Sequence, residues 1–92
     1  MRTAFKKSFL HDVKKIKDQV ILDTIHQVIL AVEEAKTLQD ISALKKLKGT
    51  KKGIYYRIKV DSYRIGVTIE NETVTFVVFD SRKDIYKYFP DK

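Results

Sequence analysis

Cations are concentrated in a short stretch in the C-terminal half of the chain. Eight Lys or Arg residues lie between positions 45 and 64, where Asp61 is the single acidic residue. Such a patch is typical of a protein that binds a polyanion, because each phosphate that it neutralises releases counterions. For the lysines alone, the alternative is a charged surface that merely keeps a small protein in solution. The residue types therefore predict a phosphate-binding surface.

Arg57, Lys59 and Arg64 are predicted to lie on one face of a β-sheet. The segments on either side of Asp61-Ser62 alternate apolar with polar residues, as half-buried strands do, and the pair itself is typical of a two-residue turn. This hairpin sets Lys59 directly opposite Arg64, and Arg57 opposite Gly66. Like charges across a ladder destabilise it by a few tenths to about 1 kcal/mol. The arrangement therefore favours a site that awaits an anion; the alternative is that both side chains spread into water, where salt screens the repulsion.

A second two-residue turn, Asn71-Glu72, extends this prediction to the next strand. It would pair Arg64 with Phe79 and Gly66 with Val77, so that Val77 and Phe79 share the cationic face. We expect the last helix to cover Phe79. Gly66 weakens a strand, so either a ligand approaches the backbone there or the strand bends or bulges.

Hydrophobic spacing predicts the elements that hold these residues. Apolar residues from Phe5 to Ile16 and from Ile21 to Val32 follow helical spacing, and Asp18 is a candidate N-cap for the second helix. A few residues before Phe5 could form an edge strand. Residues 38–47 repeat an apolar residue at every third position, which indicates a short helix ended by Gly49.

After Gly49 the period changes to two, and a final short helix is predicted from about Ser81 into Tyr88. Three strands then form an antiparallel meander, with the helices on one face of the sheet. The predicted fold is a single α+β domain spanning residues 1–92.

Several functional classes find no support in the sequence. The 92 residues include no cysteine, no glycine-rich phosphate loop and no histidine pair at ligand spacing. We therefore expect no metal and no small-molecule cofactor. No apolar run approaches the roughly 18 residues of a membrane span, and we expect a cytoplasmic protein.

Three blocks of the sequence, taken in order, resemble one protein family. They are "FKKSFLHDVKKI", "KLKGTKKGIYYRIKVDSYRIGVTIE" and "SRKDIYKYFP". Together they are similar to toxins of the RelE/ParE superfamily, and more to the RelE branch than to the ParE branch. Many relatives close with a histidine, an arginine, a variable residue and then Asp-Ile-Tyr. Here Ser81 stands where those relatives have the histidine, and the pattern continues to Tyr86.

The resemblance implies a ribosome-dependent mRNA endoribonuclease that a cognate antitoxin holds inactive. Its partners would be the antitoxin, the ribosome and mRNA. The family's basic cluster, carried over position by position, falls on Arg57, Lys59, Arg64, Arg82 and Tyr86.

RNA can be cleaved without a metal when its own 2′-hydroxyl attacks the adjacent phosphate. Arg57 and Arg64 would then stabilise charge on the phosphoryl oxygens, and Lys59 is the candidate general base. Arg82 would lie beside the leaving oxygen, and Tyr86 would stack on or orient a base. A group of lysines is expected to bind ribosomal RNA, namely Lys45, Lys46, Lys48, Lys51 and Lys52.

Two other interpretations stay open, and Ser81 supports the first of them. Serine does not carry a proton near neutral pH, so the chain could be a catalytically weak module that binds RNA or an antitoxin through the same basic face. The other alternative is a ParE-like inhibitor of DNA gyrase, although such proteins generally lack the cations on the sheet.

Overall fold

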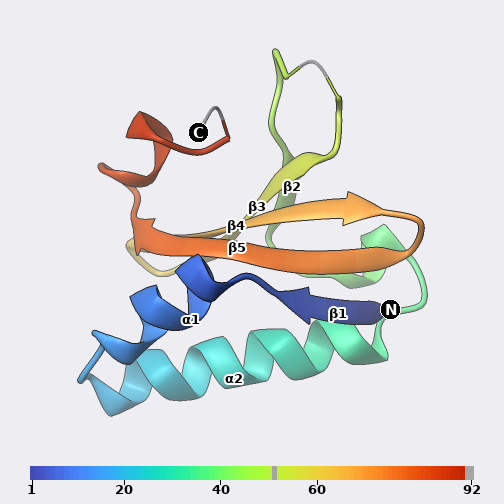
Figure 1. Cartoon of the computed structure of the whole chain (residues 1–92). Helices are drawn as coiled ribbons and strands as arrows, with labels where there is room; N and C mark the ends of the chain where they lie inside the picture. Colours follow the sequence, from blue (N-terminus) through green and yellow to red (C-terminus); the bar gives the residue numbers. More distant parts are fainter. Residues whose placement is uncertain (51, 91–92) are drawn as a thin grey trace.

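A computed structural model describes residues 1–50 and 52–90 of the chain, with the helices on one face of a five-stranded sheet (Figure 1). Its elements in chain order are β1 (Arg2–Phe5), α1 (Lys7–Lys14), α2 (Gln19–Glu34), the 3-10 turn η1 (Leu38–Asp40), β2 (Leu44–Lys46), β3 (Tyr55–Val60), β4 (Tyr63–Glu70), β5 (Thr73–Ser81) and the 3-10 turn η2 (Ile85–Lys87). No helix within the described ranges is long and apolar enough to cross a membrane.

The strands lie in the order β1-β5-β4-β3-β2, which confirms the predicted α+β class, the meander and the N-terminal edge strand. Because β1 runs parallel to β5 whereas the other neighbours are antiparallel, the sheet is mixed. In Figure 1 the C-terminal segment and the connection between β2 and β3 rise on the face opposite the helices.

The helices bury their apolar stripes against the sheet, as predicted. Asp18 caps α2, because its carboxylate accepts the amide hydrogen of Val20 at 2.9 Å. The main core combines residues of both helices with one face of β3, β4 and β5. Its best-buried members include Phe9, Ile25, Val32, Ile58, Ile65, Val67, Val74 and Phe76.

The predicted helix over residues 38–47 is wrong. Only the turn η1 forms, and the chain then enters β2, where Lys45 pairs with Arg57 on β3. The spacing of three fits a 3-10 turn, and Ala43 then takes a positive φ of 62° that no helix continues. Gly49, also at positive φ, lies in the connection between β2 and β3 and ends no helix.

The register between β3 and β4 is as predicted, with Lys59 opposite Arg64 and Arg57 opposite Gly66. The register between β4 and β5 is correct only near the Asn71-Glu72 turn. A bulge lies beyond it, because Val67 pairs with Phe76 while Gly66 pairs with Val78. The residue in between, at position 77, has no partner on β4.

The extra residue reverses the predicted faces of the last part of β5. Phe79 turns into the main core and stacks on Tyr63 with 4.9 Å between the ring centroids. Val78 instead joins a second cluster on the outer face, with Ile85 and Phe89. The predicted pairs of Arg64 with Phe79 and of Gly66 with Val77 are therefore wrong, and Arg64 lies opposite Asp80.

Helix α1 holds the bulge in place from the outer edge of β5. The Ser8 hydroxyl donates to the carbonyl of Val77, and the Asp12 carboxylate accepts the amide hydrogen of Phe79 at 3.0 Å. Ser8 and Asp12 are four residues apart and so share one helix face. Helix α1 thereby satisfies polar groups of β5 beyond the end of β1.

Gly66 is covered by the C-terminal segment. A Cβ atom at this position would lie 2.7 Å from both the Phe89 ring and a methyl group of Val78. The missing side chain therefore makes room for Phe89, which is 3% exposed. Of the two interpretations of Gly66, the bulge is confirmed and the approach of a ligand is wrong.

We expect Gly66→Ala to lower the free energy of unfolding by roughly 1–3 kcal/mol, the usual cost of an overpacked core. The added methyl group must push away Phe89 or distort the bulge, and urea denaturation measures the loss. As a control, Phe89→Leu makes room at the same place, so Gly66→Ala should cost less in that background. An equal cost in both backgrounds would show that the ring does not set the constraint.

Candidate nucleic-acid interface

A basic hollow of about 410 Å³ lies on the outer face of the sheet. It is bordered by β2, β3, β4 and the C-terminal segment, and none of its described lining residues is acidic. Those residues are Lys45, Lys46, Leu47, Lys48, Arg57, Arg64, Arg82 and Tyr86. The structure thus brings together four of the five predicted catalytic residues and three of the five predicted RNA-binding lysines.

A second hollow of about 520 Å³ lies beside the turn between β3 and β4. Arg64 and Arg82 line both hollows, whereas Lys59 lines only the second. Lys59 and Arg57 therefore line different hollows. The sequence analysis did not assign Lys83, which also lines the second hollow; no spacing signal singled it out.

Arg64 is the most buried cation of the interface, with 7% of its surface exposed. Its Nη1 atom donates to the carbonyls of Asp61 at 2.9 Å and Tyr63 at 2.8 Å. Carbonyl oxygens fix the guanidinium group without neutralising its charge. A buried cation held in this way favours an anion that completes the charge balance.

Arg57 is fixed in a similar way on β3, beside the edge strand β2. Its Nη1 atom donates to the carbonyl of Ala43 at 2.7 Å, and the Lys59 amide donates to the same oxygen at 3.2 Å. With its positive φ, Ala43 thus directs its carbonyl oxygen toward β3. Both sheet arginines are oriented by the backbone before any ligand arrives.

Arg82 and Tyr86 reach the hollow from the segment that follows β5. The Arg82 amide donates to the carbonyl of Ser62 at 2.9 Å, which joins the end of β5 to the turn between β3 and β4. The Tyr86 side chain is 46% exposed, although it is large and apolar. An exposed aromatic ring beside cations is suited to stack on a nucleic-acid base.

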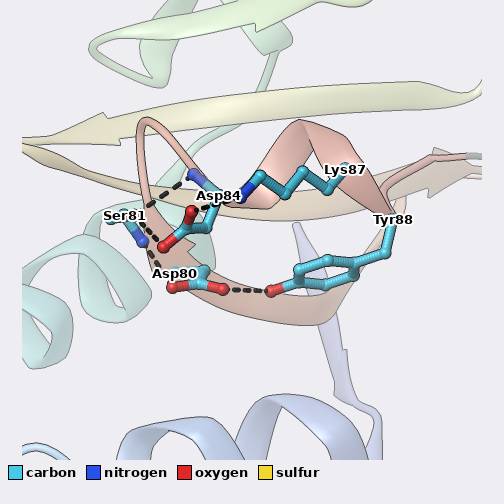
Figure 2. A network of polar contacts seen from close by, with 5 residues as sticks. All are labelled: Asp80, Ser81, Asp84, Lys87 and Tyr88. Carbon is cyan, nitrogen blue, oxygen red and sulfur yellow. Dashed lines mark hydrogen bonds and ion pairs between the residues drawn. The ribbon is translucent and has the colours of Figure 1, made fainter.

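A network of hydrogen bonds stabilises this C-terminal segment (Figure 2). The Ser81 hydroxyl accepts the Asp84 amide hydrogen at 3.2 Å and donates to the Asp84 carboxylate at 3.1 Å. Lys87 forms an ion pair with the same carboxylate at 3.1 Å. The bond to Lys87, followed by the bond to Ser81, lowers the pKa of Asp84. Ser81, the position where the sequence resemblance leads us to expect a histidine, therefore caps the turn.

Asp80 and Tyr88 form the other half of the network. The Tyr88 hydroxyl donates to Asp80 Oδ2 at 2.7 Å, and the Ser81 amide donates to Asp80 Oδ1 at 2.7 Å. Burial, and then the bond to Asp80, raises the pKa of Tyr88 above its usual value. The sequence analysis missed both residues, because the bulge decides that they face each other.

Two of the predicted RNA-binding lysines are not among the described residues that line the basic hollow. Lys52 is exposed and lines neither hollow, and Lys51 lies outside the described residues. Within the described ranges, no group of three His, Cys, Asp or Glu side chains could hold a metal ion.

Comparisons with known proteins give the family. No model of a protein family matches the chain. The toxin RelE3 of Methanocaldococcus jannaschii is 36% identical over 91 residues, which cover 98% of this chain and all of that protein. RelE in the crystal structure of the RelB–RelE complex from Methanococcus jannaschii is 34% identical with a TM-score of 0.78, over 95% of this chain and 99% of that one.

A more distant structure shares the fold. The RelE–RelB complex from Pyrococcus horikoshii OT3 matches with a TM-score of 0.71 at 14% identity, over 90% of this chain and 96% of that one. The similarity to RelE3 extends over 98% of this chain at 36% identity, which is enough to show that both proteins belong to one family. The chain therefore belongs to the RelE family, the toxins of type II toxin–antitoxin systems.

Proposed function

We propose that this RelE-family toxin is an endoribonuclease that cleaves mRNA on the ribosome. The observation that carries the proposal is the basic hollow, where three arginines, three lysines and an exposed tyrosine line one space and none of the described lining residues is acidic. RNA supplies both the phosphates that neutralise such a surface and the bases that stack on tyrosine.

The proposed reaction is an attack of the RNA 2′-hydroxyl on the adjacent phosphate. The oxygen–phosphorus bond to the following nucleotide breaks, which leaves a 2′,3′-cyclic phosphate and a 5′-hydroxyl. Arg57 and Arg64 would bind the phosphoryl oxygens, since a planar guanidinium group can donate two parallel hydrogen bonds. Their bonds to Ala43 and to the β3–β4 turn orient them in advance, which favours stabilisation of the transition state.

The remaining roles follow from the two hollows. Arg82 borders both, so it can lie beside the leaving oxygen, and Tyr86 can stack on a base in the first hollow. Lys59 would act as the general base from the second hollow, which requires the RNA to extend past Arg64. Neither a metal nor a cofactor takes part in the proposed reaction.

The exposed lysines would bind ribosomal RNA around the site. Lys45, Lys46 and Lys48 line the basic hollow, and Lys52 follows on the same connection. Lys51 is included in this proposal from the sequence alone. Such contacts add affinity without reading the RNA sequence.

A cognate antitoxin is the proposed protein partner, and both would act in the cytoplasm. The solved relatives from Methanococcus jannaschii and Pyrococcus horikoshii are complexes of RelE with RelB. An acidic antitoxin segment would neutralise the basic face and exclude RNA from it.

One observation favours a second candidate function. Ser81 is engaged in capping Asp84, and no histidine lines either hollow. A catalytically weak module that binds RNA or an antitoxin through the same surface would have these features. A ParE-like gyrase inhibitor is the remaining alternative and a possible outcome of the test below.

Mapping of mRNA ends in a cell-free translation reaction tests the proposal. We expect cuts within the ribosomal A site that require ribosomes, and a loss of at least about 100-fold in cleavage rate for Arg82→Ala and Arg64→Ala. Arg64→Lys keeps a long cationic side chain but lacks the guanidinium group. Its thermal unfolding and cleavage rate, compared with those of Arg64→Ala, separate the loss of a buried side chain from the loss of the guanidinium group. Intact mRNA with trapped DNA gyrase would favour the ParE-like alternative, and RNA binding without cuts would favour the weak module.

Lys59→Met tests the general base, because Met keeps much of the length of the side chain but cannot accept a proton. We expect the single-turnover cleavage rate to fall by at least about 100-fold, within the usual range for acid–base catalysis. Lys83→Met in the same hollow is the matched control and should retain most of the activity. Full activity of Lys59→Met would disprove the assigned role.

Lys48→Ala tests the contribution of the lysines to RNA affinity. We expect modestly weaker ribosome binding and a salt dependence that is less steep by roughly 0.7 to 0.9 in log–log slope for each lost phosphate contact, with the cut positions unchanged. Lys17→Ala removes an exposed lysine between the two helices and serves as the control. The proposal fails for Lys48 if both variants have the slope of the original protein.

A further inference from the structure

The bulge places a carboxylate directly opposite the buried arginine of the interface. Arg64 on β4 and Asp80 on β5 are register partners, so both side chains leave the same face of the sheet. Side chains opposite each other in an antiparallel pair have Cβ atoms roughly 5 Å apart, within reach of an ion pair. Such a pair would be the ordinary way to balance a cation that is 7% exposed.

The two side chains nevertheless make no ion pair. Within the described residues, the one ion pair joins Lys87 to Asp84. Arg64 donates to two backbone carbonyls instead, and each carboxylate oxygen of Asp80 already accepts a hydrogen bond. One donor is the neighbouring amide of Ser81, and the other is the Tyr88 hydroxyl eight residues along the chain (Figure 2).

We propose that Tyr88 is a positioning residue that holds the Asp80 carboxylate away from Arg64 and so preserves the charge of this arginine for the RNA phosphate. The inference rests on the proposed function, because it assumes that Arg64 binds the phosphate that is cleaved. Tyr88 itself lines neither hollow and acts only through Asp80.

The surroundings of Tyr88 are suited to this role. Its ring packs against the outer cluster of Val78, Ile85 and Phe89, and Phe89 in turn rests on Gly66. These contacts fix the hydroxyl 2.7 Å from Asp80 Oδ2. The hydroxyl donates a hydrogen bond to the carboxylate, and burial, which raises the pKa of Tyr88, strengthens its hold on the proton.

Without the Tyr88 hydroxyl, Asp80 Oδ2 would lose a hydrogen bond. The charge of Arg64, opposite Asp80 on β4, would still be unbalanced. A carboxylate that has lost a charge-assisted hydrogen bond forms an ion pair with a cation within reach of its rotamers, and Arg64 is the register partner of Asp80. An ion pair with Asp80 would neutralise Arg64, which lines both hollows, and make the RNA phosphate compete with Asp80 for this arginine. The fold itself could stay intact while the site is inhibited.

Four proteins test the inference in the single-turnover cleavage assay on ribosomes: the original chain, Tyr88→Phe, Asp80→Asn and the double variant. We expect Tyr88→Phe to lower the rate constant for cleavage by at least about tenfold, consistent with the partial loss of one charged donor. Asp80→Asn removes the competing charge, so the double variant should cleave within roughly threefold of Asp80→Asn alone.

Two comparisons separate this role from a purely structural one. Tyr88→Phe and the double variant lack the same hydroxyl, so a role limited to packing predicts that both are equally slow, and that outcome would overturn the inference. Tyr55→Phe removes another half-buried tyrosine hydroxyl beside Phe89 and should retain full activity. Thermal unfolding of all the variants shows whether the rescue of activity occurs without a rescue of stability.

A crystal structure of Tyr88→Phe keeps the inference testable if the proposed function fails. Should the original protein cut no RNA at all, the endoribonuclease proposal is wrong, whereas the position of Asp80 can still be measured. A carboxylate within ion-pair distance of the Arg64 guanidinium group in the variant supports the inference. A carboxylate that stays at its original place, apart from Arg64, contradicts it.

Discussion

The β-bulge in β5 is the constraint on which the rest of the interface depends. One extra residue opposite Gly66 and Val67 reverses the alternation of side chains along the remainder of the strand. Phe79 then enters the main core, and Asp80 moves to the cationic face. Helix α1 makes this arrangement stable, because Ser8 donates to the carbonyl of the bulged residue Val77 and Asp12 accepts from the amide of Phe79. The same strand then leads directly into the segment that carries Arg82 and Tyr86.

The outer face combines rigid orientation with charge that the described residues leave largely unbalanced. Arg57 and Arg64 donate to backbone carbonyls, which fix direction but carry no full negative charge. The single carboxylate opposite Arg64 is held by Tyr88 and the Ser81 amide. Among the described residues no carboxylate forms an ion pair with Arg57 or Arg64, which is suited to binding an external anion. We propose RNA as that anion, on the basis of the family of the chain and the chemistry of this surface.

Short-range pattern predicted much of this molecule. The period of two and the Asp61-Ser62 turn were sufficient to place Lys59 opposite Arg64, and the helical spacing with Asp18 gave α2. The bulge could not be predicted, because it depends on Ser8 and Asp12, about 70 positions away along the chain. The predicted helix over residues 38–47 failed for a related reason. The spacing of three fits a 3-10 turn, but Leu44–Lys46 then pair with the edge of β3 as a strand. Ser81 was predicted to depart from the family's closing pattern, and only the structure shows that it caps Asp84.

The chemistry of the cut ends tests the central proposal most directly, since attack by the 2′-hydroxyl leaves a signature that other nucleases do not. The measurement is to incubate the protein with programmed ribosomes in excess chelator and to identify both new mRNA termini by enzymatic end-labelling and mass spectrometry. We expect a 2′,3′-cyclic phosphate upstream of the cut and a 5′-hydroxyl downstream, formed at the same rate with and without chelator. A 5′-phosphate at the new end, or cleavage that stops when divalent metals are removed from ribosomes kept intact by polyamines, would contradict the proposed role of the arginine and lysine cluster.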